Sequence, residues 1–260
     1  MAVGNFARAA KPYRSSNTEV LHMNEKRVST GIHELDALLD GGFRRGKTYL
    51  ALGEPGTGKT IFALQFLHQA LQDGEKALYV TIDEKPADLV DQAASLGWDF
   101  TQHIERKDLL ILDASALITA RVSDISSKND LQKIIVELNN HIAKSGATRV
   151  VIDPIGPLIH AADSPSKAQD QARLLIASLQ KNAEITTLVT SQSLGRGTRG
   201  IEEYLVAGTI VLELELANSR FVRTITIEKM RSTALDPAQY LFRIAPEKGI
   251  TMQPSEEIVP

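Results

Sequence analysis

The motif Gly-Glu-Pro-Gly-Thr-Gly-Lys-Thr at positions 53–60 constrains this chain more than any other feature. It follows an apolar run (residues 47–53) typical of a buried strand, and it precedes a segment (59–71) whose apolar residues recur at helical spacing. Glycines allow the backbone to curl so that successive N–H groups point at an anion, and the next helix adds the positive end of its dipole. The motif predicts a phosphate-binding loop; the alternative is a glycine-rich turn that binds nothing.

Within this loop, Lys59 is expected to reach the β- and γ-phosphates of a nucleotide, and the Thr60 hydroxyl is expected to ligate Mg²⁺. The residues expected to contact the nucleotide are Gly53, Pro55, Gly56, Thr57, Gly58, Lys59, Thr60 and Ile61.

Strand-like and helix-like segments alternate over most of the chain, which predicts an α/β fold with a mainly parallel sheet flanked by helices. Further strands are expected at 76–82, 109–113, 149–153 and 186–191. Further helices are expected from Pro86 to Leu96, from a cap at Asp130 to Gly146, and from Ser166 to Ala183. Residues 209–216 and 220–229 alternate apolar and polar side chains, which predicts an antiparallel hairpin appended to the parallel sheet.

Composition and charge narrow the class of protein. The 260 residues contain no Cys, which excludes a disulfide scaffold and a thiol nucleophile. No run of about 18 apolar residues or secretory signal is visible, so we expect a cytoplasmic protein without a membrane span. The net charge is −3, yet residues 1–27 carry five basic and two acidic side chains. The remaining body is therefore acidic, which argues against a protein that binds duplex DNA.

We expect one domain over residues 28–252, preceded by a disordered basic leader (1–27) and followed by a short tail (253–260).

Asp153 ends a predicted strand, at the edge of the sheet where nucleotides bind in open α/β folds. A carboxylate there would hold Mg²⁺ together with Thr60. The alternative is an aspartate that caps the next turn, beside Pro154.

Asp83 and Glu84 follow the strand predicted at 76–82. Hydrolysis of a phosphoanhydride needs a water aligned with the γ-phosphorus, and a carboxylate at this edge could orient or deprotonate it. Since neighbouring residues at a strand end point to opposite sides, we expect only one of the two to face the nucleotide. The alternative is a charge pair at the start of the helix that Pro86 opens.

Taken together, these positions resemble the RecA superfamily, and specifically a single KaiC-type domain of its RadA-like branch. Several segments are similar to those of this family in sequence and in order. They are the lead-in STGIHELDALLDGGFRRGKTYLALGEPGTGKT, the elements VTIDE, RVVID and TSQ, and the closing segments GIEEYLVAGTIVLELEL and IEKMRSTALDPAQYLFRI. The resemblance implies an ATPase with a RecA-like core that forms a ring, a hexamer, with ATP and Mg²⁺ at each subunit interface.

By the same resemblance, Lys229 and Arg231 would reach the γ-phosphate of a neighbouring subunit, and Gln192 would sense the γ-phosphate in its own subunit. A cation delivered in this way stabilises charge in the transition state. The alternative for Lys229 and Arg231 is a basic pair on the surface at a strand end, and the alternative for Gln192 is a polar residue at the sheet edge.

The chain departs from the family pattern at three places. Asp83-Glu84 stands where the family has two glutamates, which implies slower turnover or a shift of the role to Glu84. Tyr204 and Leu205 stand where the kinase half of the two-domain clock proteins has adjacent Ser and Thr, so autophosphorylation with a timing role is not supported. Leu235 stands where the clock domains have a histidine after the basic pair.

The leading expectation is a Mg²⁺-dependent ATPase whose ring regulates an unknown partner protein. The alternatives are a single-stranded-DNA-binding RecA relative that uses Arg196 and Arg199, a protein kinase acting in trans, and a nucleotide-binding scaffold that does not hydrolyse. Two arginines without an aromatic residue make a weak stacking site, so nucleic acid is not favoured.

Overall fold

The structure is a computed structural model that describes residues 27–115, 128–159, 164–193, 200–217, 219–235 and 238–253. Its elements, in chain order, are β1 (Arg27–Val28), α1 (His33–Leu38), β2 (Phe43–Arg44), β3 (Thr48–Gly53), α2 (Lys59–Gln72), β4 (Ala77–Thr81), α3 (Pro86–Ser95), α4 (Phe100–Glu105), β5 (Leu109–Asp113), α6 (Lys128–Ser145), β6 (Arg149–Asp153), α7 (Gly156–Ile159), α8 (Pro165–Leu179), β7 (Thr186–Ser191), α9 (Ile201–Leu205), β8 (Gly208–Ala217), β9 (Arg220–Met230), β10 (Gln239–Ala245) and β11 (Gly249–Met252).

Within the described residues, a nine-stranded sheet has the order β11-β10-β9-β8-β3-β7-β6-β4-β5. The strands from β8 to β5 pair parallel with one another, whereas β8 with β9, β9 with β10 and β10 with β11 pair antiparallel. This confirms the predicted α/β class with a mainly parallel sheet and an antiparallel C-terminal extension. One detail differs: β8 was expected only as an arm of the appended hairpin, but it also pairs parallel with β3 and so belongs to both parts of the sheet.

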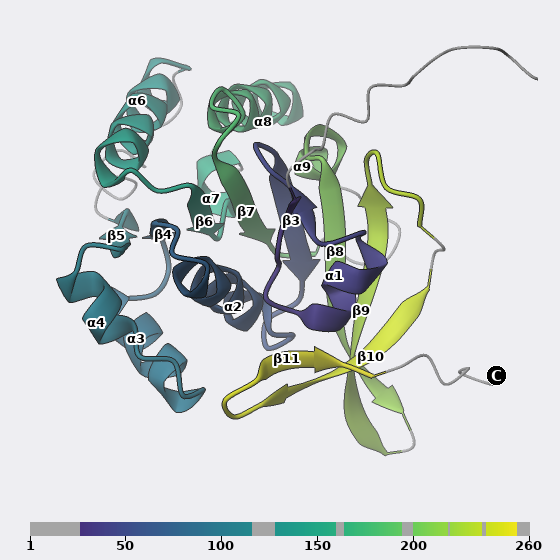
Figure 1. The fold of residues 1–260 in the computed structure, drawn as a ribbon. Helices are drawn as coiled ribbons and strands as arrows, with labels where there is room; N and C mark the ends of the chain where they lie inside the picture. The colour runs from purple at the N-terminus through teal and green to yellow at the C-terminus, as the bar shows by residue number, and fades with distance from the viewer. Residues whose placement is uncertain are drawn as a thin grey trace, which may run out of the picture.

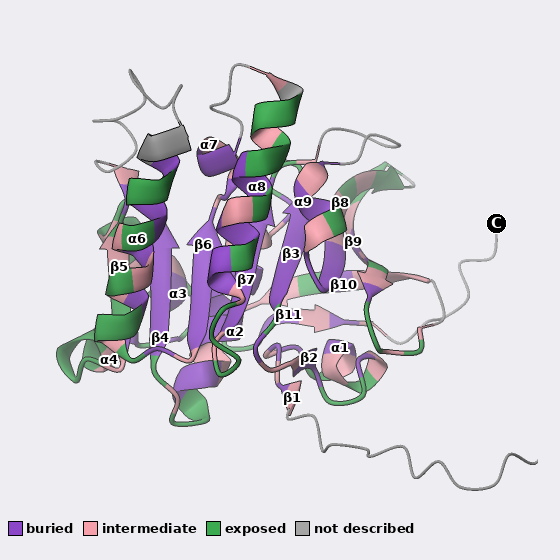
Figure 2. Ribbon diagram, turned by 90° about the horizontal axis from the view of Figure 1, so that it is seen from above, coloured by how far each residue is buried: buried purple, intermediate pink, exposed green. Residues whose placement is uncertain are grey.

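Helices cover both faces of the sheet: α2, α3 and α4 lie on one face, and α6, α7 and α8 on the other (Figure 1). Every residue of β3, β4, β6 and β7 is buried, as expected for parallel strands covered on both sides. Figure 2 shows these strands beneath helices whose outer surfaces are exposed. None of the helices in the described ranges is both long and apolar enough to cross a bilayer.

The lead-in before β2 is fixed by one carboxylate. Asp36 of α1 accepts hydrogen bonds from the backbone nitrogen (2.8 Å) and the hydroxyl (2.7 Å) of Thr30, and from the hydroxyl of Ser29. Gly31 has a φ of +84°, and a Cβ there would lie 2.7 Å from the carbonyl oxygen of Gln65. The Ser-Thr-Gly sequence therefore forms a turn that only glycine allows to lie against α2.

Gln65, a buried residue of α2, joins this lead-in to the C-terminal strands. Its Nε2 donates to the carbonyl oxygens of Gly31 (2.6 Å) and Ile250 (3.2 Å), and its Oε1 accepts from the nitrogen of Ile250 (2.7 Å). The helix that follows the phosphate-binding motif is thereby held between two segments that are distant in sequence.

Two helix boundaries differ from the predictions by more than one residue. The predicted helix ending at Ala183 stops at Leu179, because the side chain of Asn182 accepts from the nitrogen of Glu184 (2.9 Å) and turns the chain into β7. The helix predicted to start after a cap at Asp130 begins at Lys128, so Asp130 lies inside its first turn.

The predicted boundaries of the leader (1–27) and the tail (253–260) fall at the limits of the described residues. Residues 1–26 and 254–260 lie outside the described residues. Arg27 begins β1 and donates to the carbonyl oxygens of Leu39 (2.7 Å) and Gly42 (2.9 Å). Gln253 donates from its nitrogen to the carbonyl oxygen of Leu241 (2.8 Å). Both residues belong to the folded part because their backbone or side chain is bonded to it.

We expect Gln65→Ala to lower the free energy of unfolding by about 2–3 kcal/mol, because it leaves the Ile250 nitrogen and the Gly31 carbonyl without their side-chain partner. Urea unfolding followed by circular dichroism measures this change. Gln69→Ala, on the same helix, is the matched control: Gln69 is partly exposed and bonds to Asp73, so the loss should stay below about 0.5 kcal/mol. Equal losses in the two variants would contradict the role assigned to Gln65.

Candidate nucleotide site

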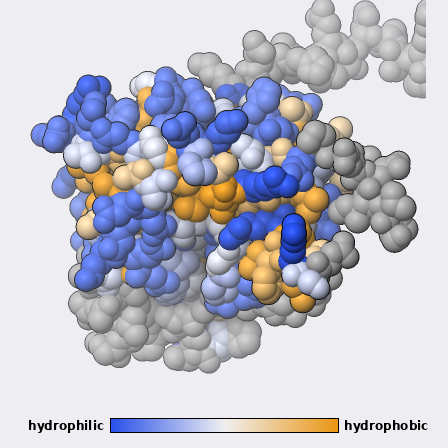
Figure 3. Space-filling model, turned by 90° about the horizontal axis from the view of Figure 1, so that it is seen from below, coloured by the Kyte–Doolittle hydropathy of each residue, from blue (hydrophilic) through white to orange (hydrophobic). Residues whose placement is uncertain are grey.

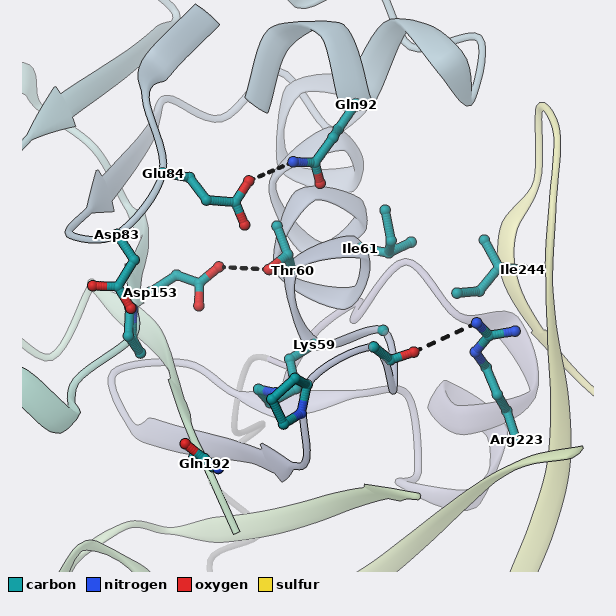
Figure 4. A pocket seen from close by; sticks show the side chains of 14 residues that line it. Lys59, Thr60, Ile61, Asp83, Glu84, Gln92, Asp153, Gln192, Arg223 and Ile244 are labelled. Carbon is teal, nitrogen blue, oxygen red and sulfur yellow. Dashed lines mark hydrogen bonds between the residues drawn. The ribbon is translucent and has the colours of Figure 1, made fainter. Parts of the chain in front are cut away.

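A pocket of about 500 Å³ lies at the carboxyl edge of the parallel strands (Figure 4). The strands β3, β6 and β7 end there and α2 begins there, which is the position where open α/β sheets bind ligands. The pocket is lined by Pro55, Gly56, Gly58, Lys59, Thr60, Ile61, Asp83, Glu84, Gln92, Asp153, Pro154, Gln192, Arg223 and Ile244.

Two glycines of the 53–60 loop are required by their surroundings. Gly58, directly before α2, has a φ of +112°, and a Cβ there would lie 3.1 Å from Cδ1 of Ile244. Gly53 ends β3, and a Cβ there would lie 2.3 Å from the carbonyl oxygen of Leu212 in β8. Larger residues would push apart the strands or the pocket wall, so both positions need glycine.

The loop places most, but not all, of the predicted contact residues in the pocket. Those that line it are Pro55, Gly56, Gly58, Lys59, Thr60 and Ile61. Gly53 and Thr57 do not line it: Thr57 is buried under the loop, where its hydroxyl donates to the carbonyl oxygen of Glu54 (2.9 Å). The Thr57 side chain thus stabilises the loop from beneath.

Lys59 is the first residue of α2 and points its ammonium group into the pocket region, where Nζ donates to the carbonyl oxygen of Glu54 at 3.0 Å. Burial lowers the pKa of Lys59, and the negative charges of Asp153 and Glu54 partly oppose that shift. A partly desolvated cation interacts strongly with an anion that enters the same pocket.

Asp153, the last residue of β6, is surrounded by hydroxyl groups. Thr60 Oγ1 donates to its Oδ2 at 3.0 Å (Figure 4). The Tyr79 hydroxyl donates to the same oxygen, and Thr190 Oγ1 donates to Oδ1. Burial and the charge of Asp153 raise the pKa of Tyr79 well above its ordinary value, so Tyr79 remains a donor.

The donor set at this point fits a magnesium ion. Mg²⁺ prefers oxygen ligands and usually takes one or two from the protein, with phosphates and water supplying the rest. The carboxylate of Asp153 and the hydroxyl of Thr60, which lie within hydrogen-bond distance of each other, are such a pair. They are the two residues predicted to hold the metal.

Asp83 and Glu84 both line the pocket, so the expectation that only one would face it is wrong. The strand β4 ends at Thr81, and the next residues form a bend in which the alternation of a strand no longer holds. The carboxylate of Glu84 accepts from Nε2 of Gln92 in α3 (Figure 4). Burial and the negative charge of Asp153 raise the pKa of Asp83.

Gln192 follows β7 and lines the pocket, where its Nε2 donates to Oε2 of Glu54 at 3.2 Å. It therefore lies in the same pocket as Lys59 and Asp153. Arg196 and Arg199, the residues of the DNA-binding alternative, lie outside the described residues.

Lys229 and Arg231 do not line this pocket. Lys229 Nζ donates to the carbonyl oxygen of Glu203 at 2.6 Å, and Arg231 Nη2 donates to that of Tyr204 at 2.9 Å. Both carbonyls belong to α9. The pocket of one chain is thus built without the basic pair.

Five residues at the site were not expected from the sequence. They are Tyr79, Gln92, Thr190, Arg223 and Ile244. Arg223 of β9 donates to the carbonyl oxygen of Gly56 at 3.4 Å (Figure 4). Hydroxyl groups inside the apolar strands β4 and β7 were a usable signal, because a buried hydroxyl requires a partner. Nothing in the local sequence marks the other three, because only the tertiary fold brings α3, β9 and β10 to this edge.

Fold and site together define a P-loop ATPase with a RecA-like core. Residues 28–257 match the family model described as "ATPase: KaiC", and the chain belongs to this family. Membership of the family supports ATP binding and ATPase activity.

Individual relatives agree with this assignment. The circadian clock oscillator protein KaiC of Prochlorococcus marinus (strain MIT 9313) is 32% identical over 238 residues, which cover 90% of this chain and 47% of that protein. The UPF0273 protein MK0039 of Methanopyrus kandleri is 31% identical over 245 residues, covering 91% of this chain and 96% of that protein. The chain thus spans about half the length of the circadian clock relatives but nearly all of the second protein.

A solved structure is similar in fold. The crystal structure of the KaiC-like protein PH0186 from Pyrococcus horikoshii OT3 superposes with a TM-score of 0.75 at 32% sequence identity. The match covers 88% of this chain and 99% of that one. It confirms the KaiC-like fold of the RecA class.

We expect Asp153→Asn to lower the pKa of Asp83 towards its ordinary value, because the substitution removes the negative charge and leaves burial as the remaining cause. Carboxyl ¹³C shifts measured against pH, without nucleotide or divalent cation, report this pKa. Since the folded state holds the Asp83 proton to a higher pH than the unfolded chain does, Asp83 reduces stability as pH rises through the folded pKa, and the variant should weaken that dependence.

Asp73→Asn is the control for this measurement. It removes the same charge just beyond the opposite end of α2, about 20 Å away by the rise of the helix, and should leave the pKa of Asp83 where it is. A pKa of Asp83 that does not respond to Asp153→Asn would show that Asp153 is not the charge that raises it.

Proposed function

We propose that this chain hydrolyses ATP with Mg²⁺ as a ring-forming, hexameric KaiC-like ATPase whose nucleotide state regulates a partner protein. The observation that carries this proposal is the meeting of Lys59, the Thr60–Asp153 pair and Glu84 around one pocket of about 500 Å³. Family membership supports ATP as the nucleotide.

Lys59 and the N-terminus of α2 would bind the β- and γ-phosphates, because both present positive charge to the pocket. Thr60 and Asp153 would hold Mg²⁺, which when bound neutralises phosphate charge in the transition state. Tyr79 and Thr190 would keep the Asp153 carboxylate in place, since each donates to one of its oxygens.

Glu84 is the carboxylate we assign to the attacking water, because Gln92 anchors its side chain beside the pocket. Asp83 lies beside Asp153 (Figure 4), and we assign it to the surroundings of the metal. Gln192 would exchange its bond to Glu54 for a bond to the γ-phosphate.

Two features support assembly. Lys229 and Arg231 lie off the chain's own pocket, as expected for cations that act on a neighbouring nucleotide. Apolar side chains are also exposed towards the tip of the β8–β9 hairpin, where Leu216 (67% exposed) pairs with Phe221 (71% exposed). The tip of this hairpin lies at the bottom of Figure 1, and Figure 3 shows apolar surface on the face seen from below. Exposed apolar patches of this kind commonly mark protein interfaces.

A nucleotide bound between subunits would allow the ring to regulate a partner protein. A ligand bound between subunits makes assembly depend on nucleotide state, so a partner that recognises the ring would respond to ATP. The clock function in the names of the circadian relatives is not part of the proposal, because Tyr204 and Leu205 stand at the positions where their kinase half has Ser and Thr.

We expect Lys59→Ala to reduce phosphate release from ATP by at least about 100-fold, because it removes the cation that stabilises the transferring phosphoryl group. A phosphate-release assay with Mg²⁺ and ATP measures this. Lys47→Ala, directly before the strand that leads into the loop, is the matched control and should retain activity. If radiolabel from [γ-³²P]ATP accumulates on protein rather than as free phosphate, the chain is a kinase and the hydrolytic assignment is wrong.

We expect the double variant Lys229→Ala/Arg231→Ala to lose at least about 1,000-fold in rate, because the transition-state charge loses its cations. Mixing it with Asp83→Asn/Glu84→Gln, which keeps the cations but lacks the carboxylates, should restore activity. Random mixing makes about a quarter of the interfaces productive, so up to that fraction of the wild-type rate is expected. Mass measurements with and without ATP–Mg²⁺ establish that mixed rings form. Mixed rings without activity would exclude cations acting between subunits.

A further inference from the structure

A buried carboxylate ties the helix α9 to the end of β7. Glu202 in α9 is 1% exposed, and its Oε1 accepts from the hydroxyl of Ser191, the last residue of β7, at 2.9 Å. Its Oε2 has no hydrogen-bond partner among the described residues. A Cβ at Gly200 would lie 2.6 Å from this carboxylate, so the backbone closes tightly over it.

Such a group is costly for stability. Burial of a carboxylate is unfavourable unless its oxygens are fully bonded, and an apolar side chain of similar size is usually at least as stabilising. Glu202 is not needed to cap α9 either, because the neighbouring Glu203 carboxylate already accepts from the nitrogen of Gly200 at 2.7 Å. The bond between Glu202 and Ser191 therefore calls for a reason other than stability.

The other end of α9 supplies that reason. The carbonyl oxygens of Glu203 and Tyr204 are the groups to which Lys229 and Arg231 donate. The backbone of Arg231 is anchored separately, through its nitrogen to the carbonyl oxygen of Ala207 at 2.8 Å. The strand end is thus held independently of α9, whereas the direction of the two cationic side chains depends on where α9 lies.

We infer that Glu202 is a positioning residue: through Ser191 it fixes α9, and α9 holds Lys229 and Arg231 in the orientation from which they reach the next subunit. This inference rests on the proposed action of the basic pair between subunits. The residue after Ser191 is Gln192, which lines the chain's own pocket and bonds to Glu54. The position of the cations that act on the neighbouring subunit is therefore fixed by the same strand end that faces the chain's own nucleotide pocket.

The test mixes two variants, and the substitutions that probe Glu202 are added only to the subunit that donates the cations. The donor is Asp83→Asn/Glu84→Gln, the acceptor is Lys229→Ala/Arg231→Ala, and activity in the mixture comes from acceptor nucleotides served by donor cations. Adding Glu202→Ala to the donor should lower kcat of the mixture at least about tenfold, because misplacing a catalytic group by about 1 Å has effects of this size or larger. The KM for ATP should change less than about twofold, since the nucleotide-binding residues of the acceptor are intact.

Three further donors separate positioning from general damage. Ser191→Ala should lower kcat in the same direction. Glu202→Gln should retain at least about half of the restored rate, because its amide oxygen still accepts from Ser191. Ser178→Ala, which removes another buried hydroxyl that donates to a helix carbonyl (Leu175, 2.8 Å), should leave the rate unaffected. Ring mass is measured for every donor, and if Glu202→Ala does not assemble, Ser191→Ala and Glu202→Gln decide.

The outcomes are distinct. If the unmodified donor fails to restore activity, the proposed action between subunits is wrong and this inference fails with it. If the unmodified donor restores activity and the Glu202→Ala and Ser191→Ala donors restore it equally well, the action between subunits stands and the inference is overturned. A loss in Ser178→Ala as large as in Ser191→Ala would also overturn it, since that loss would reflect packing alone.

Discussion

Parallel pairing of β3, β7, β6 and β4 decides where the nucleotide site lies. Leu52 pairs with Ser191, and Thr81 with Asp153, so these strands end at nearly the same level. Four parts of the site therefore meet at one edge of the sheet, directly where the strands end: the loop at 53–60, the acidic pair after β4, Asp153 and Gln192. Because α2 begins at this edge, its positive end also faces the pocket. A site assembled from segments that are distant in sequence follows from the register of a few strands.

The same fact explains how much could be predicted. The 53–60 loop lies between a strand and a helix, as predicted, because its conformation depends on local glycines. Asp153 ends a strand, as predicted, because a short apolar run leads directly to it. The expectation that only one of Asp83 and Glu84 faces the pocket assumed a strand up to residue 82. Because β4 ends one residue earlier, at Thr81, and a bend follows, strand alternation does not apply to this pair. Tyr79 was treated only as part of an apolar strand, although its hydroxyl bonds to Asp153. Contacts that join two elements from opposite ends of the chain have no local signal.

The basic pair shows why a single chain is only part of the proposed machinery. Lys229 and Arg231 donate to carbonyl oxygens of α9, and carbonyls at the end of a helix carry partial negative charge. These bonds satisfy the cations, which do not line the chain's own pocket. A second chain would offer them a stronger partner, because a triphosphate carries full negative charges. The proposed activity therefore depends on assembly, because the two cations of one subunit would find their stronger, fully charged partner only on another.

The two ends of β6 show how the fold separates stability from chemistry. Arg149 begins this strand, is 1% exposed, and pairs with Asp73 (3.0 Å) and Glu75 (3.2 Å), so its charge is neutralised by opposite charges. Asp153 ends the same strand and is held by hydroxyl groups, which are neutral donors. Hydroxyls fix the position of a carboxylate without pairing it directly with a positive charge, so its negative charge can still attract a cation. If Asp153 were paired with an arginine as Arg149 is with its acids, it would stabilise the sheet but would have little affinity for a metal ion.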